Sequence, residues 1–229
     1  MMSKKIFSAW IGNLGVYTEG KLVGEWLGMP CSKEDIENLY EKIGVKKGND
    51  EIFIADYDFP SDVSYLEKCC SEYEKPEELN MVAGLIDRYE PDKNAMQACI
   101  ENEQTVSLNE VGNMIVQAEN IPYYAYDFQG IENIPLASKE EKYGYTVAEA
   151  TGLYEKLADL NIESYVDFEA MGRDYEINDN VTLYEDGYFR MDENDIDLNL
   201  YDKEELLEMT DPSFSEPQKT VQKEYVPKL

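Results

Sequence analysis

Apolar residues along the chain follow two different periods, and short apolar runs bounded by glycine, asparagine or proline predict strands. The last two runs flank Asp186-Gly187, a pair that is typical of a tight hairpin turn. The predicted strands cover residues 6–11, 51–57, 122–128, 164–168, 181–184 and 188–191.

Helices are predicted where apolar residues recur every three or four positions behind a start signal. One such signal is a serine or threonine followed three positions later by an acidic residue, and another is proline in the first turn. These signals predict helices that begin at Ser32, Pro76, Pro91, Ser107 and Thr146. The first helix ends at Gly44, and the last extends to about Leu157.

The order of these elements predicts an α+β fold with three domains and a tail. Strands and one helix form a small α/β domain over residues 1–60, and residues 61–118 form a helical central domain. Strands return in an acidic α/β domain over residues 119–211. Residues 212–229 carry several prolines, serines and lysines, which predicts a flexible tail.

Charge adds the strongest constraint on function. The chain has 49 Asp and Glu against 20 Lys and Arg, a net charge of -29. Such a surface repels DNA, RNA and anionic lipid headgroups, so direct binding to nucleic acid or to a membrane is not expected. The acidic excess peaks in residues 161–211, with 17 acidic and 3 basic residues, where strands rather than a solvating tail are predicted.

The candidate motifs for nucleotide and metal binding lack residues that their chemistry requires. Gly15–Lys21 fits a glycine-rich phosphate loop, but Leu22 stands where Ser or Thr would hold magnesium. A calcium loop that starts at Asp195 would need Gly and Glu at the positions of Leu200 and Leu206. We therefore expect no cofactor, no metal, and a simple turn at residues 15–21.

The residue types that catalyse many reactions are scarce. The chain contains no histidine, which excludes Ser–His and Cys–His nucleophiles and histidine metal ligands. Its four cysteines, Cys31, Cys69, Cys70 and Cys99, include no C-x-x-C pair, so free thiols are expected rather than a zinc site. No catalytic residue is predicted, and we do not expect an enzyme.

The beginning of the chain bears on location. No long apolar run follows the first residues, which predicts neither a signal peptide nor a membrane span. The protein is therefore expected in the cytoplasm.

The charge itself is the remaining candidate for function. B-form DNA carries one negative charge per ~1.7 Å of its axis, so a net charge of -29 equals that of roughly 50 Å of duplex. Carboxylates on a folded scaffold can occupy a basic DNA-binding groove through the same attraction, at a lower entropy cost than a flexible polyanion. The sequence predicts an acidic protein that binds a basic DNA-binding surface.

Three segments resemble, in the right order, the signatures of ArdA-type antirestriction proteins. They are IGNLGVYTEGKLVGEWL at residues 11–27, FIADYD at residues 53–58, and YVDFEAMGRD at residues 165–174 followed by YEDGYF at residues 184–189. The resemblance implies an elongated, three-domain homodimer that imitates bent duplex DNA. It also implies a target, the type I restriction–modification enzyme, which would be blocked at its DNA-binding groove. Proteins of this kind travel on plasmids and conjugative transposons and shield incoming DNA.

The acidic C-terminal region supplies the candidate contacts with the target. These carboxylates are Glu163, Asp167, Glu169, Asp174, Glu176, Asp179, Glu185 and Asp186. Tyr184, Tyr188 and Phe189 are the candidate contacts between two subunits. Two alternatives stay open: a decoy for another basic DNA-binding protein, such as a nucleoid protein or repressor, and a nucleotide-dependent enzyme that uses Gly15–Lys21.

Overall fold

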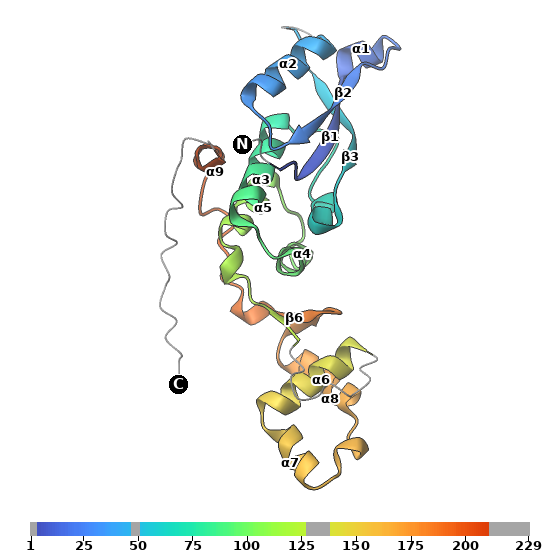
Figure 1. The fold of residues 1–229 in the computed structure, drawn as a ribbon, viewed down its shortest axis with the longest axis vertical. Helices are drawn as coiled ribbons and strands as arrows, with labels where there is room; N and C mark the ends of the chain where they lie inside the picture. Colours follow the sequence, from blue (N-terminus) through green and yellow to red (C-terminus); the bar gives the residue numbers. More distant parts are fainter. Residues whose placement is uncertain (1–3, 47–50, 127–137, 211–229) are drawn as a thin grey trace.

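The computed structural model describes residues 4–46, 51–126 and 138–210. Helices and two small antiparallel sheets follow one another along a long axis, with the N-terminal sheet near one end and a group of C-terminal helices at the other (Figure 1). The fold is α+β and elongated, which confirms the predicted class.

The N-terminal sheet contains three antiparallel strands in the order β2-β1-β3. They are β1 (Phe7–Asn13), β2 (Gly24–Met29) and β3 (Ile52–Asp58). The first and third are the strands predicted at residues 6–11 and 51–57. The hydrophobic pattern does not predict β2, because glycines and Glu25 interrupt its apolar residues. A short helix, α1 (Leu14–Thr18), lies between β1 and β2, so residues 15–18 are helical and only the rest of the segment predicted as a turn at residues 15–21 is not.

Helix α2 (Lys33–Ile43) begins and ends where the sequence predicts. The Ser32 hydroxyl accepts the Asp35 N–H at 3.2 Å, and the Asp35 carboxylate accepts the Ser32 N–H at 3.0 Å, which forms a capping box. Gly44 ends the helix in the left-handed conformation at φ 77°, which glycine adopts without steric cost.

Four helical segments make up the centre of the molecule. They are the 3-10 segment η1 (Ser61–Lys68), α3 (Pro76–Tyr89), α4 (Lys93–Glu101) and α5 (Leu108–Val116). Pro76 starts α3 and Ser107 caps α5, as predicted. The start of α4 differs from the predicted Pro91, because Asp92 caps the helix by accepting the Ala95 N–H at 2.9 Å.

A second antiparallel sheet has the strand order β4-β6-β5. Its strands are β4 (Tyr123–Ala125), β5 (Val181–Leu183) and β6 (Gly187–Arg190). Strands β5 and β6 form the predicted hairpin. The strand predicted at residues 122–128 is shorter in the structure, and its last two residues lie outside the described part of the chain.

The C-terminal helices correct two predictions. They are α6 (Lys139–Ala150), α7 (Leu153–Asp159) and α8 (Phe168–Asn178). Thr146 does not start a helix: it lies inside α6, where its hydroxyl donates to the Lys142 carbonyl at 3.0 Å, and Ser138 is the cap. Residues 164–168 are not a strand, because Asp167 accepts the Ala170 N–H at 2.9 Å and starts α8.

The chain returns to the central helices after β6. Two amide side chains one turn apart on α5 hold the returning segment by paired backbone hydrogen bonds. Asn113 accepts from the Tyr201 N–H at 2.8 Å and donates to its carbonyl at 3.0 Å. Gln117 does the same with Asp197, at 3.2 and 2.9 Å. These buried amides replace the hydrogen bonds that a sheet would provide.

The last helix, α9 (Lys203–Thr210), packs against α3 and α5. Its Leu206 is fully buried in one large core that also contains residues of β1, β3, α2 and the central helices. Packing thus joins the regions predicted as the N-terminal and central domains, together with α9. The boundaries at residues 60, 118 and 211 stay a prediction, and the tail at residues 212–229 lies outside the described residues.

Candidate acidic interaction surface

Most carboxylates in the described part of the chain form no ion pair with a described basic side chain. Eight ion pairs join side chains within the described residues, and together they involve eight acidic side chains. The whole chain has 49 acidic and 20 basic residues. Within residues 4–46, 51–126 and 138–210, the negative charge is therefore not cancelled by ion pairs.

Helix α2 shows how local structure arranges these charges. Glu34, Glu37 and Glu41 are exposed and follow one another at three- and four-residue intervals, which places them on one face of the helix. The rise of an α-helix spaces them by about 4.5 and 6 Å along the axis. The pair of Glu37 with Lys33 is long at 3.8 Å and exposed, so it offsets little of this charge.

The eight carboxylates predicted as target contacts lie on η3 (Glu163–Tyr165), on and around α8, and in the β5–β6 turn. All of them reach the surface to some extent. Asp167, Asp174, Glu185 and Asp186 are exposed, whereas Glu163, Glu169, Glu176 and Asp179 are half-buried.

Several of these carboxylates serve the fold. Asp167 caps α8, as described above. Glu169 pairs with Arg173 one turn along the same helix, and Glu185 pairs with Lys142 of α6 at 3.0 Å. Such groups are less available to an external cation than an unpaired carboxylate is.

Asp179 links α8 to α6 by accepting a hydrogen bond from the Tyr143 hydroxyl at 3.0 Å. Burial, reinforced by the hydrogen bond to Asp179 and the charge of its carboxylate, raises the pKa of Tyr143, so the phenol stays a donor at neutral pH. Asp179 is therefore a structural group as well as a surface charge.

The remaining candidates differ from one another. Asp174, Glu176 and Asp186 form no side-chain hydrogen bond or ion pair with any described residue. Glu163 has one carboxylate oxygen that is buried without a hydrogen-bond partner among the described residues. The first three are the best placed of the eight to meet a basic partner.

The predicted subunit contacts are occupied within one chain. Phe189 is 1% exposed and belongs to the large core. The Tyr188 ring packs against the rings of Tyr143 and Tyr124, at 4.9 and 5.4 Å between centroids, and Tyr184 meets Tyr123 edge-on at 6.0 Å. Because β6 is the central strand of its sheet, it offers no free edge to a second subunit.

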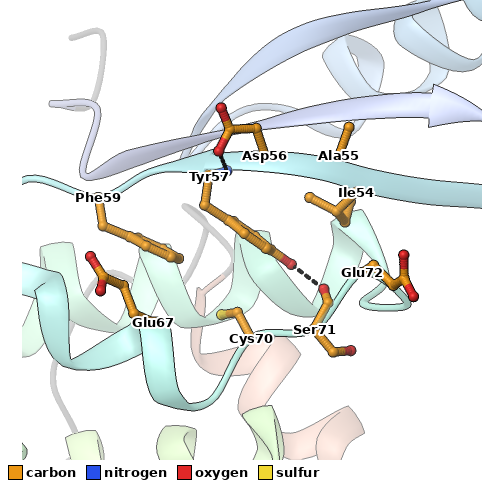
Figure 2. A pocket seen from close by; sticks show the side chains of 9 residues that line it. All are labelled: Ile54, Ala55, Asp56, Tyr57, Phe59, Glu67, Cys70, Ser71 and Glu72. Carbon is orange, nitrogen blue, oxygen red and sulfur yellow. Dashed lines mark hydrogen bonds between the residues drawn. The ribbon is translucent and has the colours of Figure 1, made fainter. Parts of the chain in front are cut away.

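A shallow cavity of about 420 Å³ lies between β3 and the turn that follows η1 (Figure 2). The rings of Tyr57 and Phe59 stack at 5.0 Å, and the Tyr57 hydroxyl donates to the Ser71 carbonyl at 2.6 Å. Burial raises the pKa of the Cys70 thiol, so this lining residue is not a thiolate at neutral pH. Cys70 is therefore not an activated nucleophile in this cavity.

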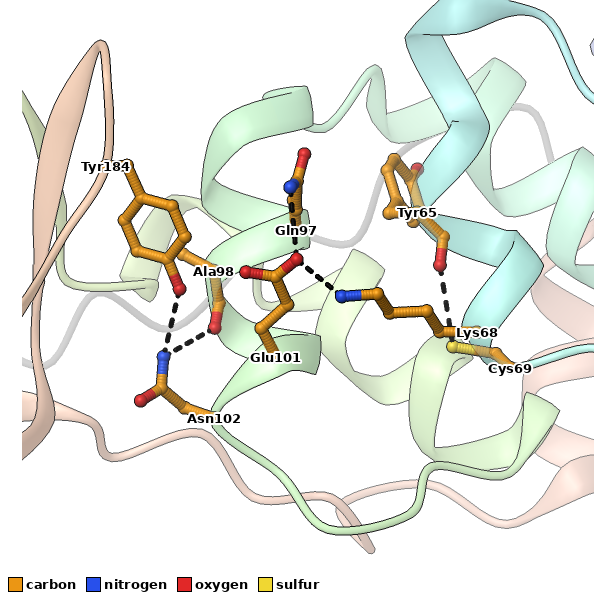
Figure 3. Close-up of polar contacts among 8 residues, drawn as sticks. All are labelled: Tyr65, Lys68, Cys69, Gln97, Ala98, Glu101, Asn102 and Tyr184. Carbon is orange, nitrogen blue, oxygen red and sulfur yellow. Dashed lines mark hydrogen bonds and ion pairs between the residues drawn. The ribbon is translucent and has the colours of Figure 1, made fainter.

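A polar cluster joins the central helices to the second sheet (Figure 3). Asn102, at the end of α4, donates to the Tyr184 hydroxyl at 3.3 Å and to the Ala98 carbonyl at 2.8 Å, and accepts from the Thr182 hydroxyl at 3.1 Å. These bonds hold the β5–β6 hairpin against α4.

The neighbouring Glu101 accepts from Lys68 at 2.6 Å and from Gln97 at 3.1 Å (Figure 3). Burial acts to raise the pKa of Glu101, but the hydrogen bonds from Lys68 and Gln97 outweigh it, and the pKa is lowered overall. Glu101 is thus held ionised as a bridge between α4 and η1.

The neighbours of the candidate phosphate loop and of the cysteines show what these residues can bind. In the Gly15–Lys21 segment, the N–H groups of Glu19, Gly20 and Lys21 all donate to carbonyls of Val16 or Tyr17, so they cannot surround a phosphate. The four cysteines are free thiols, as predicted. Among the described residues, no group of three or more acidic or cysteine side chains is arranged to hold a metal ion.

A search for membrane-spanning segments covered the same residues. No helix in ranges 4–46, 51–126 and 138–210 has both the length and the apolar character needed to cross a membrane.

The fold and the surface together define a class: elongated, strongly acidic α+β proteins whose carboxylates are distributed over the molecule and mostly unpaired. The model of the family described as antirestriction protein (ArdA) matches residues 9–190, which is most of the chain. The protein therefore belongs to the ArdA family of antirestriction proteins. No curated protein matches the sequence.

Proposed function

We propose that this protein inhibits a type I restriction–modification enzyme by occupying its DNA-binding groove as a mimic of B-form DNA. Membership of the antirestriction family supports the general function. The observation that carries the finer proposal is the distribution of carboxylates without basic partners along an elongated fold.

The electrostatics favour such a competitor. A groove that binds DNA presents Lys and Arg to phosphates, and the release of counterions contributes much of the affinity. A net charge of -29 equals that of roughly 50 Å of duplex, and two copies double this length. We therefore propose that the protein acts as a homodimer, although not through the edge of β6. A sedimentation mass near the 26.4 kDa of one chain at micromolar concentration would contradict this.

The proposed mode of action needs binding and no chemistry by the inhibitor. We therefore propose that the protein is not an enzyme and that it acts in the cytoplasm, where it would shield DNA that enters on a mobile genetic element.

The first test is inhibition of a purified type I enzyme that cleaves unmodified DNA. We expect inhibition that weakens steeply between about 50 and 200 mM salt, because the contacts are ionic. Affinity that does not change over this range would show that the acidic surface is incidental. Binding to a nucleoid protein or repressor without inhibition of restriction would favour the decoy alternative.

The second test locates the contacts. Single neutralisations of Asp174, Glu176 or Asp186 should weaken inhibition only a few fold, because an exposed ionic contact contributes about 0.2–1 kcal/mol. The triple variant D174N/E176Q/D186N should weaken it about three-fold to a hundred-fold, the sum of three such contacts. The matched control E34Q/E37Q/E41Q removes the same charge from α2 and should have a smaller effect. One folded single variant that loses all inhibition would instead indicate a discrete site.

A further inference from the structure

The N-terminal sheet has a second face that the core does not use. Along β1, Phe7, Ala9 and Ile11 point into the core, so Trp10 points to the opposite side. The strand register places Trp26 of β2 and Asp56 of β3 on either side of Trp10. These three side chains form a row across the sheet, which we call the tryptophan row.

Glycines beside this row leave room for the rings to lie across the sheet. A Cβ atom at Gly12 would come within 2.6 Å of the Phe53 ring and 2.7 Å of the Trp10 ring. A Cβ atom at Gly24 would collide with the Trp10 ring as well. The absence of side chains at these positions lets the Trp10 indole cover the backbone of β1 and β2.

The rings of Trp10, Phe53 and Tyr17 form one aromatic surface, and Trp26 lies opposite Trp10 in the strand register. Phe53 contacts Trp10 and Tyr17, with centroid distances of 6.1 and 5.3 Å. Trp26 is 47% exposed and Tyr17 is 52% exposed. Large exposed aromatic groups that lie together on a soluble protein are typical of an interaction surface.

Carboxylates border this surface. Asp56 lies opposite Trp10, and Asp58 lies opposite Ser8 on the same face. Figure 2 shows the Asp56 carboxylate on the side of β3 away from the Tyr57 ring. Neither aspartate forms an ion pair within the described part of the chain. The side chain of Lys5 already lies on this face, over Gly28, which shows that a long cationic side chain fits there.

We propose that the tryptophan row binds an arginine side chain of a basic protein partner. The guanidinium would stack on the Trp10 and Trp26 rings and pair with the Asp56 carboxylate. Arginine suits this site better than lysine, because its planar, weakly hydrated head both stacks on indole and pairs with a carboxylate. This inference rests on the proposed function for the nature of the partner, a basic DNA-binding groove.

The chain provides its own reporter for this site. It has two tryptophans, and both belong to the tryptophan row. A ligand that stacks on this surface must therefore change the intrinsic tryptophan fluorescence. We would titrate the full chain with hexa-arginine and, separately, with hexa-lysine of equal charge at about 100 mM salt.

We expect hexa-arginine to bind at least about three-fold more tightly than hexa-lysine and to change the tryptophan emission more strongly. D56N and W26L should each weaken hexa-arginine binding about three- to ten-fold, and W26F should restore part of the loss. The controls D87N and Y73L replace an exposed aspartate and an exposed tyrosine elsewhere and should stay within about two-fold of the wild type.

Equal affinity and equal fluorescence change for the two peptides would overturn the proposal, and so would wild-type binding by D56N and W26L. The comparison of peptides needs no variant, so it stands even if W26L does not fold. The peptide measurement is also independent of any restriction enzyme. If the protein binds arginine preferentially but does not inhibit restriction, the proposed function is contradicted and this inference is not. If it inhibits restriction but shows no preference for arginine, this inference is contradicted and the proposed function is not.

Discussion

The N-terminal and central parts of the molecule are stabilised differently from the helices α6–α8. The N-terminal and central parts share one large hydrophobic core that includes Leu79, Leu85 and Leu206. The helices α6–α8 pack on two small hydrophobic clusters, one around Phe168 and one around Val181. The C-terminal helices also carry much of the predicted contact surface, so their mutual repulsion is opposed by little apolar burial.

Close backbone approach compensates for this small core. A Cβ atom at Gly144 of α6 would collide with the Phe168 carbonyl, and one at Gly172 of α8 would collide with the Glu140 carbonyl. The two helices therefore touch through glycines along a crossing that no other residue type fits. An acidic surface can therefore be carried by helices with little apolar burial when those helices pack backbone to backbone.

The largest loss of stability is expected at the close backbone contact between α6 and α8. Gly172→Ala should destabilise α6–α8 by at least about 3 kcal/mol, because the clash is with backbone and not with a flexible side chain. Hydrogen exchange should show loss of protection in residues 139–178 while α3 and α5 keep theirs. The control Ile177→Ala changes a side chain that is 80% exposed and should leave protection unchanged. Cooperative loss of protection in the whole chain would show that the two parts do not unfold separately.

Leu206→Ala tests the large core, as Gly172→Ala tests the C-terminal helices. Removing a fully buried side chain from the large core should lower the free energy of unfolding by about 3 kcal/mol. Denaturant unfolding measures this loss, and protection should fall in α3, α5 and α9 before it falls in α6. Leu200→Ala, at a position that is 46% exposed, is the matched control. An effect of Leu206→Ala no greater than that of the control would place α9 outside the core.

Asn113→Ala should cost about 2 kcal/mol, because it leaves the Tyr201 N–H without its partner and leaves the Tyr201 carbonyl only the longer hydrogen bond from the Asn109 amide at 3.4 Å. The returning segment should detach from α5, and limited proteolysis should cut within residues 194–210 more rapidly than in the wild type. Asn38→Ala on the exposed face of α2 should cause no such loss. Unchanged proteolysis would mean that Gln117 and α9 hold the segment without Asn113.

The smallest expected effect concerns the capping box of α2. Hydrogen bonds from the side chain and backbone of Ser32 lower the pKa of Asp35 from its ordinary value of 3.8. A carboxylate whose pKa is lower in the folded state stabilises the fold at pH values above its unfolded-state pKa. That stabilisation is lost as the pH falls through the folded-state pKa. Asp35→Ala should therefore cost about 1 kcal/mol or less at pH 7 and less still below pH ~3.8. Thermal unfolding at several pH values measures the difference, and a constant difference would contradict the ionic cap.

Local signals explain which elements the sequence predicts correctly. Ser32 with Asp35 and Ser107 with Glu110 mark helix starts through hydrogen bonds between near neighbours, and both capping boxes are present. The same signal at Thr146 with Glu149 is misleading, because α6 already begins after Ser138, whose side chain accepts the Glu141 N–H. The helix then continues past Thr146, with Tyr143 buried on its inner side. A cap motif indicates a possible start and does not show that the preceding residues are not helical.

Some features of the candidate acidic surface follow from the sequence, and others depend on the fold. Net charge and the absence of histidine follow from composition, so they indicate an acidic binding protein without knowledge of the fold. Which carboxylates are unpaired depends on neighbours distant in the sequence: Glu185 meets Lys142, whereas Asp186 meets no basic side chain among the described residues. The sequence pattern does not indicate the tryptophan row, because Trp10, Trp26 and Asp56 become neighbours only when three strands pair.

Composition, caps and turn residues act over a few positions, and they are sufficient to specify the helices, the β5–β6 hairpin and the overall charge. The edge strand β2, the return of residues 194–210 to α5 and the glycine crossing of α6 with α8 depend on contacts between distant segments. Such contacts form only after loop closure brings those segments together, and burial of polar and apolar groups then selects one arrangement. For that reason the acidic character can be read along the chain, whereas the set of free carboxylates and the aromatic face belong to the folded molecule.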